Sequence, residues 1–226
     1  NLKSWDWWYY AEKLRKQKYN LDDSELRPYF ALSKVRQGAF DVAKKLYGIT
    51  FQEINNVPTP HPDAKAFEVK EADGSHIGVL YMDFHPRASK NGGAWCGHYR
   101  SYHKTQEGKE ITPVVTVVTN FTTPTEDKPA LLSMDEVETL FHEFGHALDG
   151  LLAEHHYPQT NIPRDFVELP SQIMEHWAAH PKVIKSYAKH YETGEVIPDE
   201  LIKKIENSSY FNQGFANVEY LAASFL

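Results

Sequence analysis

The strongest pattern in the chain is a run of apolar residues that recur at the spacing of an α-helix. Counted at about 100° per residue, they form a single stripe, made of Val137, Leu140, Phe141, Phe144, Leu148, Leu151 and Leu152. Ser133 followed by Glu136 is a capping box, which predicts that the helix begins at this serine. We expect the helix to continue to about Glu154. His142 and His146 lie nearly opposite the apolar stripe, together on one face.

Three helices are predicted in the first 48 residues. Residues 5–19 form an aromatic-rich helix, and its three Trp and three Tyr suggest that it packs against neighbours on several sides. A short second helix is expected from the capping residue Asp22 to Tyr29. A third helix begins at Ser33 and ends at Gly48, since glycine is the residue type that most often closes a helix.

Strand-like patterns follow in the middle of the chain. Asp73-Gly74 predicts a tight hairpin turn, residues 57–62 form a proline-rich connector, and residues 87–97 form a glycine-containing loop. Taken together, the pattern predicts a small, largely antiparallel sheet. This sheet is either a scaffold or an edge on which an extended peptide pairs, and the pattern favours neither. Four segments are predicted as strands: 49–54, 66–70, 77–84 and 114–121.

A second helical region is expected after residue 133. Beyond a loop at residues 155–162, Pro163 fits the first turn of a helix, where its missing N–H costs nothing. Pro170 then falls inside that helix and should kink its axis. Two further helices are predicted, at residues 182–191 and 198–206. The result is a mainly α fold with a small antiparallel β-sheet, of the α+β class, in three segments: 1–48 helical, 49–121 sheet and 133–226 helical and zinc-binding.

Composition narrows the classes of function. The chain has 226 residues, of which 41% are hydrophobic and 24% charged, as in an ordinary globular protein. A net charge of -7 argues against a nucleic-acid partner, and no run approaches the ~20 apolar residues of a membrane span. No signal-peptide layout is visible, so a cytoplasmic location is expected. The lone Cys96 excludes an internal disulfide and a thiolate-only metal site.

The chemistry centres on the motif His-Glu-x-x-His at residues 142–146. Residues four apart share a helix face, so His142 and His146 can offer two imidazole nitrogens to one zinc ion. Glu143 is close enough to act as a general base on a metal-bound water. Two solvent-facing histidines on a surface helix would explain the polarity, but not the adjacent glutamate.

Zinc in a hydrolase usually has three protein ligands, so a third is needed. The longer motif that ends in a third histidine fails here, because residue 149 is Asp and residue 152 is Leu. A glutamate from the following helix is the alternative. Glu168 and Glu175 both qualify, being seven residues apart, and local spacing does not separate them. Glu154 is weaker because it lies on the metal helix itself, and nothing in their spacing favours His155, His156, His176 or His180.

With these motifs in view, the chain resembles the thimet oligopeptidase and peptidyl-dipeptidase group of zinc peptidases, and within it the bacterial peptidyl-dipeptidase branch. The carrying motifs are Phe141-His142-Glu143-Phe144-Gly145-His146 and Arg164-Asp165-Phe166-Val167-Glu168-Leu169-Pro170-Ser171-Gln172. Supporting matches are Glu175-His176-Trp177, Gly92-Gly93-Ala94-Trp95, Asn120-Phe121 and the block from Arg36 to Ile49, so the resemblance covers essentially the whole chain.

The resemblance implies a zincin-like catalytic domain that is mostly helical, with a small sheet at one wall of a deep channel. It implies that Glu168 is the third zinc ligand beside His142 and His146, and that Glu143 is the general base. It also implies short peptides as substrates, with C-terminal dipeptides released in the peptidyl-dipeptidase branch. Asp165, Glu138 and Asp149 are candidates for orienting the ligands through hydrogen bonds.

Three departures from the family stand out. Asp149 replaces a histidine that the family commonly has but does not use as a ligand. The loop between Tyr157 and Arg164 is shorter than usual and lacks the family's Ser-Gly-Thr. Family members are about three times longer and include an N-terminal helical lobe and a later Gly-Tyr-rich segment that helps to hold the substrate. The chain therefore corresponds to part of a catalytic domain.

Two functions from different classes follow. The first is a zinc-dependent peptidase acting on short peptides. The second is a zinc- or peptide-binding module without turnover, since groups that stabilise the transition state outside the zinc site are missing. A metal-free helical scaffold is a third possibility, which requires that the purified chain hold no stoichiometric metal.

Overall fold

The computed structural model describes residues 2–154 and 162–225. The helices are α1 (Asp6–Tyr19), α2 (Asp23–Leu26), a 3-10 turn η1 (Arg27–Tyr29), α3 (Leu32–Tyr47), α4 (Met134–Leu152), α5 (Leu169–Ala179), α6 (Pro181–Tyr187), α7 (Asp199–Ser208) and α8 (Gln213–Ser224). The strands are β1 (Thr50–Ile54), β2 (Lys65–Lys70), β3 (His76–Asp83), β4 (Trp95–Arg100), β5 (His103–Lys104), β6 (Glu110–Ile111) and β7 (Val114–Val118). This mixture confirms the predicted α+β class.

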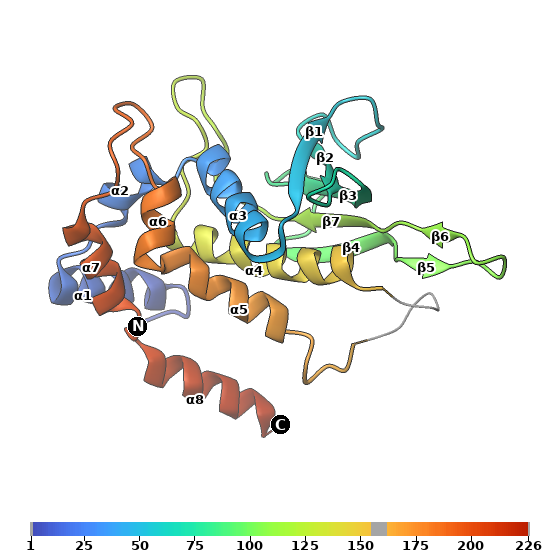
Figure 1. Cartoon of the computed structure of the whole chain (residues 1–226). Helices are drawn as coiled ribbons and strands as arrows, with labels where there is room; N and C mark the ends of the chain where they lie inside the picture. The colour runs from blue at the N-terminus through green and yellow to red at the C-terminus, as the bar shows by residue number, and fades with distance from the viewer. Residues whose placement is uncertain (1, 155–161, 226) are drawn as a thin grey trace.

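Helix α4 is the centre of the fold. It lies between the sheet, which is above it in Figure 1, and α5 beneath it, and its apolar residues Leu140, Phe141 and Phe144 are fully buried. The predicted capping box is confirmed. Ser133 Oγ accepts from the Glu136 backbone N–H at 3.2 Å, and a Glu136 carboxylate oxygen accepts from the Ser133 N–H at 2.7 Å. The helix start is therefore fixed by local chemistry, and the buried stripe fixes which face turns outward.

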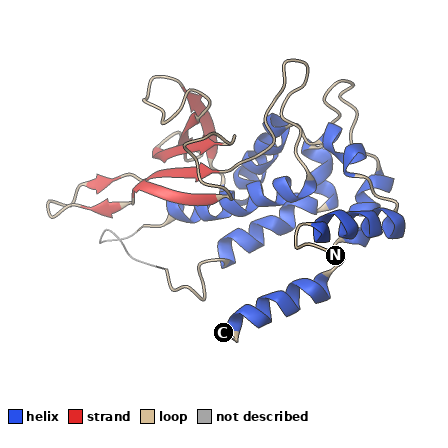
Figure 2. Cartoon of the chain, turned by 180° about the vertical axis from the view of Figure 1, so that it is seen from behind, coloured by secondary structure: helices blue, strands red, loops and turns tan. Residues whose placement is uncertain are grey.

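The five-stranded sheet has the order β1-β2-β3-β7-β4. Three of its four pairings are antiparallel, as predicted, and one parallel pairing, between β3 and β7, makes the sheet mixed. Strand β7 lies between β3 and β4. It runs parallel to β3 and antiparallel to β4. The predicted hairpin between β2 and β3 is confirmed, with Gly74 in the left-handed region at φ +90. Strand β4, at one edge of the sheet, begins inside the predicted loop at residues 87–97. Figure 2 shows the strands gathered at one end of the molecule and the helices at the other.

The helix predicted to begin at Pro163 begins instead at Leu169, and residues 164–168 form turns. The physical reason is Pro170, which has no N–H to donate to the carbonyl of Phe166 and so cannot sit inside a helix without a broken bond. It occupies the first turn of α5, where that bond is not needed. Glu168 therefore precedes α5 and does not share a helical face with Glu175. Of the loop predicted at residues 155–162, residues 155–161 lie outside the described part of the chain, as does most of the shortened segment after Tyr157.

Helix α1 forms where predicted, but it has no buried residue, so the expectation that it packs on several sides is wrong for this chain. Helices α6 and α7 also form as predicted, although α6 ends at Tyr187 rather than residue 191. Within residues 2–154 and 162–225, no helix combines the length with the apolarity that crossing a bilayer demands.

Candidate metal centre

Three side chains from two elements meet on the outward face of α4. His142 and His146 are one turn apart on that helix, and each directs its Nε2 toward the Glu168 carboxylate. Glu168 Oε2 lies 3.3 Å from His142 Nε2 and 3.1 Å from His146 Nε2. One potential donor atom from each of the three residues lies within 4.8 Å of the others. The structure thus brings together the three residues predicted to hold zinc.

The spacing of these atoms fits a metal ion. Tetrahedral zinc with bonds of about 2.0–2.1 Å holds its ligand atoms roughly 3.3 Å apart, close to the two separations measured here. Burial lowers the pKa of His146 and outweighs the opposing effect of the Glu168 carboxylate. The neutral imidazole, which is the form that binds a metal, is therefore favoured at this position. Two nitrogens and one carboxylate oxygen also form a donor set that zinc commonly takes in hydrolases.

Ser171 and Gly145 place Glu168 at the site. The Ser171 hydroxyl donates to Glu168 Oε2 at 2.8 Å, and this bond is the main reason that the pKa of Glu168 lies below its usual value. Gly145 lies between the two histidines, where the start of α5 crosses α4. A Cβ at residue 145 would lie 2.5 Å from the carbonyl oxygen of Pro170. Only glycine permits this approach of the two backbones, so sequence reasoning missed a residue that positions the third ligand.

Glu175, the other glutamate considered as a third ligand, contacts the opposite nitrogen of His142 instead. Its Oε1 lies 2.5 Å from Nδ1 of His142, the nitrogen on the far side of the ring from Glu168. A carboxylate on the second nitrogen fixes the orientation of a metal-binding imidazole and makes it more basic. Among the side chains that the structure describes, no hydrogen bond links Asp165, Glu138 or Asp149 to a candidate ligand. Glu175 therefore has the orienting position that was expected of those three.

Glu143 follows His142 on α4, and it is only 6% exposed. Its Oε2 has no hydrogen-bond partner within the described residues, which is costly for a buried carboxylate unless a ligand or water satisfies it. Burial raises the pKa of Glu143, with a further rise from Glu168 and an opposing effect of His142. Cys96 on β4 is close enough that burial, together with the charge of Glu143, raises the pKa of its thiol to about 12. The edge strand β4 therefore passes beside the predicted base.

Two histidines one turn apart, a glutamate from a neighbouring element and a buried glutamate beside them are the arrangement of a single-metal hydrolase. The sequence pattern of Peptidase family M3 matches residues 1–226, and the chain belongs to this family. It is 46% identical over 229 aligned positions to dipeptidyl carboxypeptidase of Salmonella typhimurium, which cover all of this chain. It is 40% identical over 208 positions, 90% of the chain, to oligopeptidase A of Escherichia coli. Organellar oligopeptidase A of Arabidopsis thaliana is 41% identical over 230 positions, 98% of the chain.

The chain is much shorter than these relatives. It spans 33% of the Salmonella protein, 31% of the Escherichia coli oligopeptidase and 29% of the Arabidopsis protein. The similarity thus covers nearly the whole of this chain and about a third of each relative.

Proposed function

We propose that the chain is part of the zincin-like catalytic domain of a zinc-dependent peptidase that hydrolyses short peptides, with residues 1–226 belonging to that one domain. Zinc would be held by His142, His146 and Glu168, with Glu143 as general base. The observation that carries the proposal is the meeting of those three donor atoms beside a buried carboxylate, that of Glu143, whose Oε2 has no hydrogen-bond partner among the described residues. Similarity to two dipeptidyl carboxypeptidases, at 46% identity, supports the release of C-terminal dipeptides.

The side chains have separable roles in this reaction. Bound zinc would supply a polarised scissile carbonyl and a water of lowered pKa. Glu143 would accept a proton from the attacking water and pass it to the leaving amine, and its raised pKa suits a group that holds a proton between the two steps. Glu175 keeps the His142 ring oriented through Nδ1, and Ser171 holds the Glu168 carboxylate.

The proposal is tested with Glu143→Gln, which keeps the size of the side chain and removes its basicity. This variant should retain zinc, measured by metal analysis, while cleavage of a quenched short peptide falls by at least about 10²-fold. Glu219→Gln is the matched control, because it makes the same carboxylate-to-carboxamide change at an exposed residue of α8. This variant should cleave the peptide as the parent does. Undiminished cleavage by Glu143→Gln rules out the assigned base.

The alternative is a zinc- or peptide-binding module without turnover, which the short span of the chain relative to its relatives favours. Among the described strands β4 is at the edge of the sheet beside Glu143, where an extended peptide can add as a further strand. Stoichiometric zinc without chelator-sensitive cleavage supports this second function. Absence of stoichiometric metal excludes the zinc peptidase and the zinc-binding module, and it is the result that a metal-free helical scaffold requires. The compartment stays a prediction, since the relatives include proteins named as organellar and as probably cytosolic.

A further inference from the structure

The loop that leads into strand β4 contains two consecutive glycines, Gly92 and Gly93. A Cβ at either residue would have open space around it, so neither glycine serves a close approach to another part of the chain. Gly93 has φ +87, a backbone conformation that favours glycine. Before the glycines the loop is anchored, because Lys90 Nζ donates to the carbonyl of His85 at 2.8 Å. Residues 91–94 follow this anchor, and their glycines restrict the backbone least, so a further contact is needed if β4 is to begin at a fixed place.

The side chain of Asn120 supplies that contact. Its Nδ2 donates to the carbonyl oxygen of Asn91 at 2.8 Å and to that of Gly93 at 2.7 Å, so both N–H bonds of the amide are used. Within the part of the chain that the structure describes, no other side chain forms a hydrogen bond to residues 91–94. The amide of Asn120 therefore holds the loop on both sides of Gly92.

Asn120 is itself held in place by its neighbours in the chain. The N–H of Thr119 donates to the carbonyl of Asp83 at 2.9 Å, and the N–H of Phe121 donates to the carbonyl of Phe84 at 2.8 Å. The buried hydroxyl of Thr119 also donates to the Phe84 carbonyl, at 2.9 Å. These bonds continue the contact between β7 and β3 beyond the end of both strands. The amide is thus presented from the centre of the sheet, and the loop takes its position from Asn120.

Strand β4 is the element that this loop positions. It begins at Trp95, directly after residues 91–94, and it pairs with β7 from that residue onward. It also lies against α4 (Figure 1), where a Cβ at Gly150 would collide with the imidazole of His98 on β4. Among the described strands, none pairs with the other side of β4. The order of this edge, beside the helix that carries Glu143, therefore depends on how firmly the preceding loop is held.

We propose that Asn120 is a positioning residue for peptide cleavage, because its amide fixes residues 91–94 and so keeps the edge of β4 in place before a substrate peptide binds. This inference rests on the proposed function. An extended peptide that adds to a strand edge binds through backbone groups at fixed positions. If the edge is not ordered beforehand, the peptide must order it on binding, and that cost lowers the affinity.

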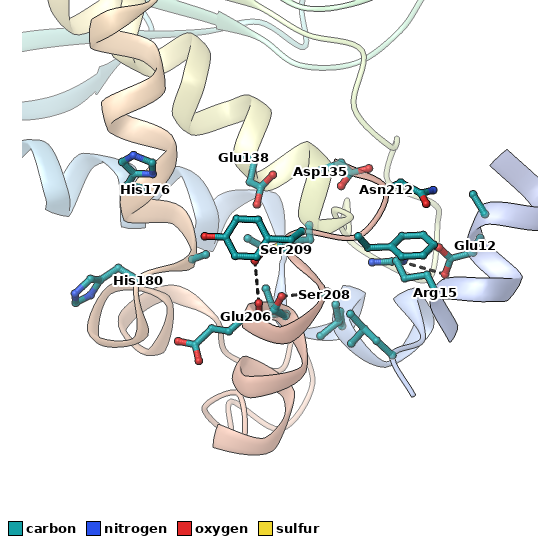
Figure 3. A pocket seen from close by; sticks show the side chains of 18 of the residues that line it. Glu12, Arg15, Asp135, Glu138, His176, His180, Glu206, Ser208, Ser209 and Asn212 are labelled. Atoms are coloured by element: carbon teal, nitrogen blue, oxygen red, sulfur yellow. Dashed lines mark hydrogen bonds and ion pairs between the residues drawn. The ribbon is translucent and has the colours of Figure 1, made fainter. Parts of the chain in front are cut away.

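A different place for a peptide is the cavity of about 710 Å³ shown in Figure 3. Its walls include Asp135 and Glu138 of α4 and Glu206 of α7, and among the described residues that line it none belongs to β4 or to residues 91–94. A peptide held in this cavity would not respond to Asn120. Glu206→Gln removes one of the exposed carboxylates of the wall, and if the peptide binds along β4 this variant should bind it within about threefold of the parent.

The test uses the zinc-loaded chain with two substitutions of Asn120. Asn120→Ala removes both donors, and Asn120→Asp keeps the shape of the side chain but directs acceptors at the two carbonyl oxygens. Asn91→Ala is the matched control, because Asn91 is exposed and contributes its backbone carbonyl, not its side chain, to the contact. Gly93→Ala is a second way to disturb the loop, since it leaves Asn120 intact and strains the backbone at φ +87. Zinc content should equal that of the parent in all four variants.

Hydrogen exchange and steady-state kinetics report the effect. Exchange of the amides of residues 94–96 should be faster by about tenfold in both Asn120 variants and in Gly93→Ala, because the loop is then free to open. For a quenched short peptide, KM should rise by about tenfold, as expected for the loss of two hydrogen bonds, while kcat stays unchanged. Asn91→Ala should change neither exchange nor KM.

Peptide affinity is also measured without turnover. A fluorescent form of the same peptide is titrated into the zinc-loaded Glu143→Gln protein, and fluorescence anisotropy gives its Kd. Adding Asn120→Ala or Asn120→Asp to this protein should raise the Kd by about tenfold. A parent chain that binds the peptide without cleaving it contradicts the proposed catalysis, while the Kd still tests the role of Asn120.

Several results overturn the proposal. If Asn120→Asp exchanges and binds as the parent does, the shape of the side chain matters and its donors do not. Faster exchange with unchanged KM and Kd shows a contact that only stabilises the loop. Loss of zinc together with affinity shows damage to the metal centre. A parent that does not bind the peptide, or a Glu206→Gln variant that weakens binding when the Asn120 variants do not, shows that no peptide lies along β4.

Discussion

The hydrogen bond between Glu175 and His142 gives the sharpest prediction for the metal centre. Glu175→Ala removes the carboxylate that lies 2.5 Å from His142 Nδ1 and leaves the three candidate ligands in place. The imidazole then loses both its fixed orientation and the negative charge that makes Nε2 a better donor. Zinc affinity should fall while the fold is retained, because Glu175 is partly exposed and not part of the core.

The size of the effect follows from the exposure of the pair. Loss of a carboxylate that supports a metal-binding histidine typically costs about 10- to 100-fold in affinity. The Glu175 side chain is 38% exposed, so water partly replaces the lost bond and the lower part of that range applies. We expect a loss of about 10- to 30-fold, or roughly 1.4–2 kcal/mol. Glu175→Gln keeps an acceptor oxygen without the charge and should lose about three- to tenfold.

The measurement is a competition titration of zinc against a chromophoric chelator at fixed pH. Glu138→Gln is the control, since it removes a neighbouring carboxylate that makes no hydrogen bond to His142 in the described structure. Its zinc affinity should stay within about threefold of the parent. If Glu175→Ala binds zinc as tightly as the parent, or no more weakly than Glu138→Gln does, the orienting role assigned to Glu175 is wrong.

Two further predictions concern packing and charge. Gly145→Ala should lower both the melting temperature and zinc affinity, because its Cβ would meet the Pro170 carbonyl; overpacking costs about 1–3 kcal/mol. Gly214→Ala, with open space around it, is the control and should be neutral or slightly stabilising. Asp83→Asn should cost about 3–5 kcal/mol in urea unfolding at pH 7, because it leaves the buried Lys90 ammonium, 3.0 Å away, without its counter-charge. Burial opposes ionisation of Asp83, but Arg87 and Lys90 outweigh it and lower its pKa, so this stabilisation is present above about pH 4 and lost as pH falls further. An Asp83→Asn deficit that is as large at pH 3 as at pH 7 contradicts this assignment.

Local sequence chemistry predicted most of the helices. The capping box at Ser133, the closing glycine at Gly48 and the stripe along α4 each depend on residues within a few positions of one another, and all three appear in the structure. Such signals are reliable because the backbone groups that they satisfy are local.

Non-local pairing was not predictable in the same way. The parallel contact of β3 and β7 depends on β4 lying outside β7, and β4 has no alternating pattern because Cys96 and Gly97 interrupt it. The start of α5 was misplaced because a proline in the first turn of a helix and a proline that kinks one look alike in sequence. The meeting of Glu168 with the histidines depends on the crossing at Gly145, which local spacing does not encode.

The meeting of His146 with Glu168 also has a consequence for thermal stability. His146 and Glu168 are joined by roughly 20 residues of chain, so a metal ion bound to both would act as a cross-link that closes this loop. For a loop of that length, the chain-entropy model of a cross-link gives a stabilisation of about 3 kcal/mol. In that case the zinc content of a preparation would set its melting temperature as well as its chemistry.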